Sequence, residues 1–286
     1  MYKFVSFLLY CTIIHMHASE SSIVLKNMSD CARTGLIGGT SSLLATFLYM
    51  PFHYAQSQKA QGLEIKIKMN NIHHCFRGYT ILAANNIPVI ALQTAVYKLI
   101  NNIMGCPHNN KDPNEKTTLA AILAGTSSAP FSNASGLLAV HKQNTGLPIR
   151  TIINNFPHRY KSLSRGIVPS TLQGILFATT YTNGLPFIKN YIHHYCDNTL
   201  AAFTSSACLS SILLTATTQP LRVMATKLHA DVEEKYYKGA SDVFIKTIHQ
   251  HGLKNFYTGS SFRTCGNILA LSALYIIQQM PNYLKM

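Results

Sequence analysis

Long apolar stretches alternate with polar linkers along this chain, and several of the stretches are as long as a membrane-spanning helix. A helix that crosses a bilayer needs about 20 mostly apolar residues. The stretches are not pure runs of Leu and Ile, because Gly, Ala, Ser and Thr recur in them, and such small residues let helices approach closely in lipid. We therefore expect six transmembrane helices, near residues 34–54, 80–100, 117–140, 168–188, 200–221 and 262–280.

The placing of charged residues supports a membrane protein. All ten acidic residues lie outside the six stretches, as expected because ionisable groups are costly in hydrocarbon. The chain has 24 Lys+Arg and a formal net charge of +14, although charged residues make up only 12% of it. Basic residues are concentrated in the linkers 55–78, 142–166 and 225–259. The positive-inside rule places these linkers on one face of the membrane and both termini on the other.

Two soluble alternatives fit the pattern less well. A soluble all-α protein would show amphipathic stripes with charged outer faces, which are not seen. A basic nucleic-acid-binding protein would show a basic helix face with interleaved aromatic residues, so we expect no nucleic-acid partner. The seven cysteines are scattered without a Cys-x-x-Cys pair, and the histidine pairs lack a carboxylate or thiol at ligand spacing. We expect no metal site and no cofactor.

A threefold repeat is visible in the linkers. Gly78, Gly166 and Gly259 each end a short tripeptide that precedes an even-numbered stretch, while Pro51 and Pro220 each close an odd-numbered one. The unit is a stretch, a break, a basic linker, a glycine and a second stretch. The sequence therefore predicts an N-terminal extension at 1–25 and repeats at 26–105, 106–195 and 196–286.

This pattern resembles the mitochondrial carrier family over about residues 30 to 280. The third repeat carries the most specific motifs, namely Pro220, Lys227, Tyr237-Lys238-Gly239 and Tyr257-Thr258-Gly259. The resemblance implies an all-α membrane protein whose six transmembrane helices form three tandem two-helix repeats with pseudo-threefold symmetry and short matrix-side helices. It also implies a monomeric transporter, which needs no catalytic residues because it works by alternating binding from two faces.

The gate motifs of the family are altered in this chain. In carriers, a proline kinks each odd-numbered helix, and an acid and a base after it form the charge pairs that close a gate. After Pro51, the acidic position holds His53 and the basic position holds Gln56. After Pro220, the acidic position holds Arg222. We expect these residues to form the kinks and the gate without the usual ion pairs.

The second repeat offers Ser135 or Gly136 in place of the proline, and Gln278 takes the basic gate position at the end of the sixth helix. Hydrogen bonds from His53, Gln56 and Gln278 would then replace ion pairs. A neutral hydrogen bond contributes about 1 kcal/mol net, roughly half as much as a charge-assisted one. The gate should be weaker than in the family; the alternative is that His53 faces lipid headgroups and takes no part.

The resemblance also implies where substrate binds. The string Gln173-Gly174-Ile175 is similar to the fourth helix of ADP/ATP carriers, where the glycine lets an adenine ring lie on the helix. The basic chain favours an anionic substrate, and Arg263 is placed to meet its phosphate or carboxylate; a helix-end cation on lipid phosphate is the alternative. The substrate-contacting positions implied are Asn85, Asn86, Gln173, Gly174, Ile175, Arg263, Gly266 and Asn267.

These features predict transport of an anionic metabolite, most simply an adenine nucleotide, across the mitochondrial inner membrane. A carrier-like scaffold that has lost transport is the alternative, because the gate charges are missing. Lipid phosphate, as in cardiolipin, is expected at the helix N-termini near Gly78, Gly166 and Gly239. Residues 1–25 resemble a secretory signal peptide, with an ordinary tail as the alternative. A parasite- or bacterium-encoded carrier that is first secreted into a host cell would account for such a segment.

Overall fold

The computed structural model describes residues 43, 45–65, 69–105, 115–158, 161–194 and 199–283. The described residues are mainly helical, and no strand occurs among them, so the all-α prediction is confirmed. The N-terminal extension and the beginning of the first predicted transmembrane helix lie outside the described residues.

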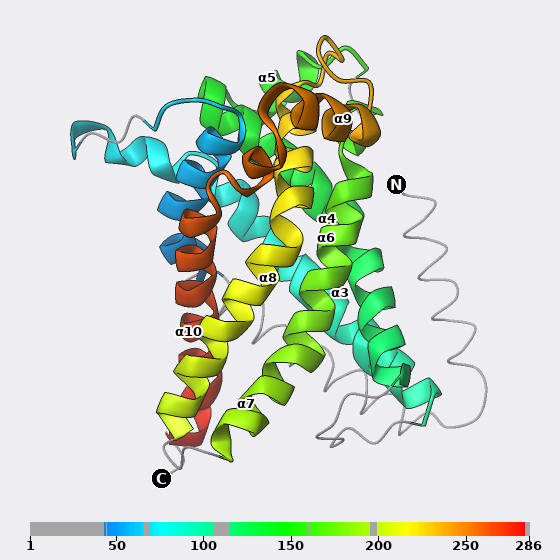
Figure 1. Cartoon of the computed structure of the whole chain (residues 1–286), viewed down its shortest axis with the longest axis vertical. Coiled ribbons are helices and arrows are strands. Elements are labelled where there is room, and N and C mark those ends of the chain that lie inside the picture. The colour runs from blue at the N-terminus through cyan, green and yellow to red at the C-terminus, as the bar shows by residue number, and fades with distance from the viewer. Residues whose placement is uncertain are drawn as a thin grey trace.

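Six long helical segments match the six predicted stretches in order (Figure 1). The fourth of them passes through a π-helical turn, η3 (Thr180–Gly184), which joins α6 to α7. Shorter helices occupy the linkers. The long segments are residues 45–60, α3 (Tyr79–Ile103), α4 (Glu115–Thr145), α6 (Ile167–Thr179) with α7 (Leu185–His193), α8 (Thr199–Ala230) and α10 (Ser260–Tyr283), and the short ones are η1 (Met69–Phe76), α5 (Ile149–Asn154), η2 (Lys161–Ser164), α9 (Ala240–His251) and η4 (Leu253–Tyr257).

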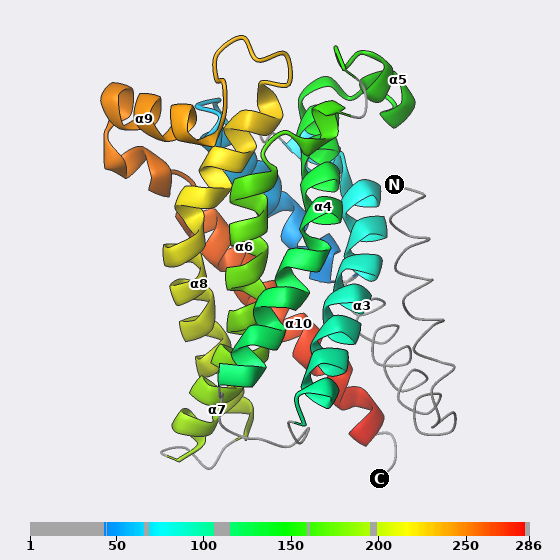
Figure 2. The same ribbon diagram turned by 90° about the vertical axis from the view of Figure 1, so that its right-hand side faces the viewer.

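The long segments are arranged as a ring. Along the chain, α3 packs on α4, α4 on α6, α6 and α7 on α8, and α8 on α10. The helix of residues 45–60 closes the ring, since Thr46 accepts a 2.5 Å hydrogen bond from Asn86 of α3 and Tyr49 abuts Gly266 of α10. The short helices α5 and α9 are both at one end of the bundle, which we call the α5/α9 end, and α7 is at the other (Figures 1 and 2).

Polar and apolar side chains are distributed as in a protein surrounded by lipid. In α8, Ser206 and Ser211 are completely buried, whereas Ile212 and Leu213 are 52% and 49% exposed. Soluble proteins show the reverse preference. The same outward placing of large apolar residues recurs on α3, α4, α6, α7 and α10, for example at Leu99, Leu123, Leu172, Phe187 and Leu269. Large contiguous apolar surfaces are rare on soluble monomers, so this exterior supports the predicted hydrocarbon environment.

A test of length and hydropathy alone identifies fewer membrane-spanning helices than the six long segments of the bundle. Among the described residues, one helical stretch, His73–Asn101, is long and apolar enough to cross a membrane by length and composition, and Ile167–Thr179 is apolar but shorter. The other segments are diluted by the Ser, Thr, Gly and Ala residues that pack inside the ring. The six helices are therefore observed, while six membrane crossings stay a prediction.

The two prolines lie inside continuous helices, so these helices extend beyond the stretches predicted from the sequence, while the kinks expected at the prolines stay a prediction. Pro51 lies inside the helix of residues 45–60, and Pro220 lies ten residues before the end of α8. The α4 helix likewise contains Pro130 and continues to Thr145. A proline removes one backbone hydrogen bond, but packing by neighbouring helices keeps such helices continuous in membrane proteins.

Three glycines place the starts of α3, α6 and α10 in the same way. Gly78, Gly166 and Gly259 all adopt the left-handed conformation, with φ of 90°, 80° and 80°. An added Cβ would lie 3.4 Å from the Cα of Ala139, 3.0 Å from the His229 ring and 3.2 Å from the Cα of Gln56, respectively. Each glycine therefore seats an even-numbered helix against an odd-numbered helix from another part of the chain. This recurrence is what a threefold repeat requires, although the repeat boundaries stay a prediction.

Conventional hydrophobic cores occur at the α5/α9 end. One cluster joins Leu137 of α4 to Ile152, Phe156 and Val232, and a second joins Ala60, Val223 of α8 and Phe256 of η4. Burial of apolar side chains drives folding where water is the solvent. This end of the bundle therefore has the interior of a water-exposed domain, in contrast to the polar interior of the ring.

Candidate functional site

A cavity of about 250 Å³ lies inside the ring, and all six long segments contribute to its wall. Six of the eight predicted substrate residues and two of the predicted gate residues line it. These are Asn85 and Asn86 of α3, Gln173 and Gly174 of α6, Arg263 and Asn267 of α10, and His53 and Arg222.

The remaining two predicted substrate residues serve helix packing instead. An added Cβ on Gly266 would lie 2.5 Å from the ring of Tyr49. The backbone of Ile175 abuts Gly125 of α4, where a Cβ would come within 2.7 Å of the Ile175 Cα. Gly174 does line the cavity, but its own added Cβ would lie 3.1 Å from the carbonyl oxygen of Gly125. The close crossing of α4 and α6 thus accounts for Gly174 without an adenine ring, and its role in substrate binding stays a prediction.

His53 joins three helices at the floor of the cavity. Its Nδ1 lies 3.2 Å from Nε2 of Gln143 in α4, and its Nε2 is hydrogen-bonded to the Arg222 guanidinium of α8. The side chain is 2% exposed, so the alternative in which His53 faces lipid headgroups is wrong. The helix of residues 45–60 therefore meets α4 and α8 at this point.

The chemistry of Arg222 fixes the proton on His53. A guanidinium only donates hydrogen bonds, so His53 Nε2 is the acceptor and Nδ1 carries the proton. Gln143 must then accept from Nδ1–H through Oε1, a buried oxygen that has no other partner among the described residues. The amide orientation follows from this network, as such assignments generally do. His53 is therefore neutral in this hydrogen-bond arrangement.

Two guanidinium groups face the cavity without a carboxylate beside them. Arg263 is only 4% exposed, and its Nη1 donates to Oε1 of Gln219 at 3.2 Å, while the Gln219 amide donates to the Thr258 carbonyl at 2.9 Å. The burial of Arg263 excludes its alternative as a surface cation on lipid. The Nε of Arg222 has no partner among the described residues, and no described acidic residue lines the cavity.

The other predicted gate residues take no observed part in the closure. Gln56 is completely buried, but neither of its amide atoms has a hydrogen-bond partner among the described residues, so the latch expected from it is not formed. Gln278 lies within α10, and its side chain is outside the described part of the structure. Ser135 and Gly136 of α4 line the cavity, and Gly136 packs against His229 of α8.

Polar contacts that the sequence did not predict tie α4 and α6 to α8. Oδ1 of Asn133 lies 3.0 Å from His229 Nε2 and accepts from Ser170 at 2.9 Å. Arg165, just before α6, forms a 3.3 Å ion pair with Asp231, just after α8, and both side chains are at most 8% exposed. A basic linker residue gives no sign in the sequence of which acid it will meet, so this pair could not have been found by periodicity.

The predicted lipid sites differ from one another. Gly78 and Gly166 are buried against α4 and α8, whereas Gly239 begins α9 in an extended conformation with open space around its Cα. Lipid binding at these glycines stays a prediction.

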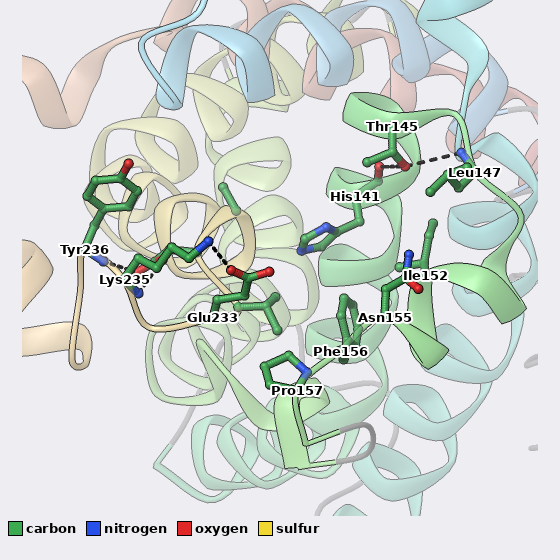
Figure 3. A pocket seen from close by; sticks show the side chains of 13 residues that line it. His141, Thr145, Leu147, Ile152, Asn155, Phe156, Pro157, Glu233, Lys235 and Tyr236 are labelled. Carbon is green, nitrogen blue, oxygen red and sulfur yellow. Dashed lines mark hydrogen bonds and ion pairs between the residues drawn. The ribbon is translucent and has the colours of Figure 1, made fainter.

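A second cavity, of about 330 Å³, lies between the end of α4, α5 and the loop after α8 (Figure 3). Its floor is apolar, with the ring of His141 edge-on to Phe156 at 5.1 Å, and its rim carries the ion pair of Lys235 with Glu233. None of the residues singled out from the sequence lines it, and it belongs to the water-exposed end.

A ring of helices with an apolar exterior and a polar axial cavity is typical of membrane-embedded transport proteins. The family model described as "Mitochondrial carrier protein" matches residues 197–284, which include all of α8, α9 and α10. The peroxisomal nicotinamide adenine dinucleotide carrier of Arabidopsis thaliana is 26% identical over 167 residues, which are 53% of this chain and 49% of that protein. The chain thus spans about half the length of the curated relative it matches. Residues 197–284 are therefore similar in sequence to mitochondrial carrier proteins, and the relative matched over 167 residues is itself a carrier by name.

Proposed function

We propose that the protein moves an anionic metabolite, specifically an adenine nucleotide, across a membrane by alternating access. The observation that carries this proposal is the axial cavity, in which Arg222 and Arg263 face the interior without an acidic neighbour among the described residues. Burying unpaired cations costs free energy, and an anionic ligand offsets that cost. The related plant protein carries a dinucleotide by name, which supports the same class of substrate.

The chemistry of the wall suits a phosphate-bearing ligand with a polar ring. Guanidinium groups bind phosphate oxygens through paired, charge-assisted hydrogen bonds. Side-chain amides both donate and accept, as base and ribose groups require. Asn85 of α3 and Gln173 of α6 offer such amides, and Asn267 of α10 offers another that now donates to Thr215 at 3.3 Å.

Uptake into liposomes tests the proposal. We expect proteoliposomes preloaded with ATP to accumulate labelled ATP, and Arg263→Gln to lower the rate about tenfold or more, because a hydrogen bond to a charged group contributes about 1.5–3 kcal/mol. Lys98→Gln, outside the cavity lining, is the matched control and should leave the rate unchanged. Labelled NAD in a parallel series identifies which nucleotide is preferred.

A carrier-like scaffold remains the second candidate, favoured by the absence of an acid at position 53 or 222. If neither nucleotide is taken up or exchanged by protein that is folded and inserted, the scaffold is the better description.

We further propose the mitochondrial inner membrane as the location, with the protein acting as a monomer of three repeats and binding cardiolipin near Gly78, Gly166 and Gly239. Because the related plant protein is peroxisomal by name, fractionation against markers of both organelles is the decisive measurement. Recovery with the peroxisomal marker would overturn this location without affecting the transport proposal.

A further inference from the structure

The second cavity, at the α5/α9 end, has the size and the apolar floor of a small-molecule site (Figure 3). Ile152, Phe156 and Val232 form part of its lining, and each of these side chains is at most 6% exposed. A volume of about 330 Å³ lies within the range of pockets that hold one small ligand. Burial of an apolar ligand on this floor is therefore favourable.

The charged groups of the lining are already neutralised. Lys235 pairs with Glu233 at the rim, and Asp231 pairs with Arg165 on the side away from the cavity lining. The Asp231 carboxylate also accepts three backbone N–H groups. An ionic ligand would meet no uncompensated charge among these groups, so the cavity suits a neutral molecule.

One buried nitrogen in the wall lacks a partner. Nε2 of His141 is buried and makes no hydrogen bond among the described residues, while the same ring is hydrogen-bonded to the backbone of His229. That bond therefore uses Nδ1. His229 lies in the last turn of α8, where a carbonyl oxygen has no partner within the helix, so Nδ1–H donates to this oxygen.

The unpartnered nitrogen is consequently an acceptor. Most imidazoles are uncharged at neutral pH, and in a neutral imidazole whose Nδ1 donates, Nε2 accepts. Figure 3 shows the ring of His141 pointing away from α4 toward the loop that carries Glu233 and Lys235. A ligand with a hydrogen-bond donor would satisfy this nitrogen from within the cavity.

We propose that this cavity binds a small, neutral aromatic molecule that carries a hydroxyl or N–H donor. The donor meets Nε2 of His141, and the ring lies on the floor beside Phe156, since aromatic pairs favour offset-stacked or edge-to-face contacts. The ligand contacts α4 and α5 on one side and the loop after α8 on the other. Because it needs both sides, it stabilises their present junction.

The test uses two probes that differ in the donor alone. β-Naphthol combines a flat apolar ring system with one hydroxyl group, and its methyl ether keeps the rings but lacks the donor. Thermal unfolding of the purified, detergent-solubilised protein is followed against the concentration of each probe, because a ligand of the folded state raises the midpoint. We expect the wild type to bind β-naphthol about fivefold more tightly than the ether, as one net hydrogen bond provides.

Variants identify the acceptor. His141→Phe keeps an aromatic ring but removes the acceptor, so β-naphthol should bind about fivefold more weakly than to the wild type, with binding of the ether unchanged. His158→Phe is the matched control, since it makes the same change at an exposed position outside the lining, and it should bind both probes as the wild type does. Comparison at one detergent concentration cancels partition of the probes into micelles.

A further variant tests the place of binding. Asn155 is exposed and lines the cavity, so Asn155→Trp should cover the opening and weaken binding of both probes; it serves also if His141→Phe does not fold. In the wild type, β-naphthol should slow hydrogen exchange of backbone amides in residues 152–156 and 231–236. Slowing elsewhere only would overturn the proposal.

Two other outcomes also overturn it. Equal preference for β-naphthol in the wild type and His141→Phe would show that Nε2 is not the acceptor, and binding of neither probe would show that the cavity holds water alone. The inference goes beyond the proposed function and does not rest on it, because each readout is of binding. A protein that binds β-naphthol here and moves no nucleotide refutes the proposed function alone.

Discussion

Two junctions show how differently the helices of this bundle are joined at the α5/α9 end. Between the start of α6 and the loop after α8, an ionic network holds the chain: the buried Arg165 pairs with the buried Asp231 at 3.3 Å and with the exposed Glu234 at 2.9 Å, and it also donates to the Tyr237 carbonyl. The Asp231 carboxylate further accepts the backbone N–H groups of residues 235, 236 and 237. We call this network the charged joint.

Toward the helix of residues 45–60, α4 is held by neutral groups. Gln58 donates to Asn144 at 3.1 Å, Asn144 donates to Gln61 at 2.8 Å, and His53 meets Gln143. Asn144 is exposed, so water competes for its hydrogen bonds. We call these contacts the neutral joint. Because charge-assisted hydrogen bonds are roughly twice as strong as neutral ones, the neutral joint should separate first when this end opens, with residues 45–60 as the moving element.

The largest expected effect comes from breaking the charged joint. Asp231→Asn leaves the buried Arg165 without its main partner, and loss of one member of a buried pair costs about 3–5 kcal/mol. Thermal or denaturant unfolding in detergent measures the loss. Glu233→Gln is the control, because its ion pair with Lys235 is solvent-exposed and its removal should change stability little. Equal effects of the two substitutions would show that burial of the charged joint contributes nothing.

A smaller effect is expected at the neutral joint. Asn144→Ala removes two partly exposed neutral hydrogen bonds and should cost about 1 kcal/mol. Hydrogen exchange followed by mass spectrometry shows which part of the structure opens. Backbone amides of residues 56–61 should exchange faster than in the wild type, while those of residues 225–231 should keep their protection. Faster exchange at 225–231 instead would contradict the proposed order of opening.

The smallest effect on stability, and the most informative one for mechanism, comes from converting the neutral joint into a charged one. The double variant Gln58→Lys with Asn144→Asp places opposite charges where the two amides now meet. Since such partly exposed pairs contribute about 0.2–1 kcal/mol, stability should rise slightly and nucleotide exchange should slow. Each single variant should lack this gain in stability. If the double variant exchanges nucleotide at the wild-type rate, separation of the neutral joint is not a rate-limiting step of transport.

The helices were predictable from the sequence because length, small residues and the exclusion of acids are local properties. Their ends were not, since the helices that contain Pro51 and Pro220 continue beyond the predicted stretches, where tertiary packing keeps them helical. Among candidate site residues, Asn85, Gln173 and Arg263 do line the cavity. Gly266 does not line it. Which side of α10 faces the cavity depends on the rotation of the helix, which the sequence does not give, and a glycine can serve close helix packing as well as substrate binding.

Long-range partners were beyond the sequence. Arg165 and Asp231 are separated by 66 positions, and each looked like an ordinary charge in a linker. By contrast, the approach of His53 to Arg222, 169 positions away, was expected from the gate motifs of the family that the sequence resembles, whereas the contact of His53 with Gln143 was not. Recurrent spacing predicted that the repeats exist, whereas the asymmetry between the charged and neutral joints appears only when the contacts themselves are seen.

The π-helical turn η3 has a consequence for how this segment accommodates insertions and deletions. Its i→i+5 hydrogen bonding houses an additional residue in an otherwise α-helical segment, and Asn183 within it donates to Thr118 of α4 at 3.2 Å. Deleting one residue of Thr180–Gly184 would convert η3 into regular α-helix. It would rotate α7 about the helix axis by about 100°, which is the rotation per residue of an α-helix. Phe187 and Tyr191, now more than half exposed, would leave the lipid-facing side. A sequence alignment of this chain with a relative that lacks the π-helical turn therefore needs a one-residue gap at η3. Without that gap, each residue of α7 would be aligned with a residue on a different face of the relative's helix.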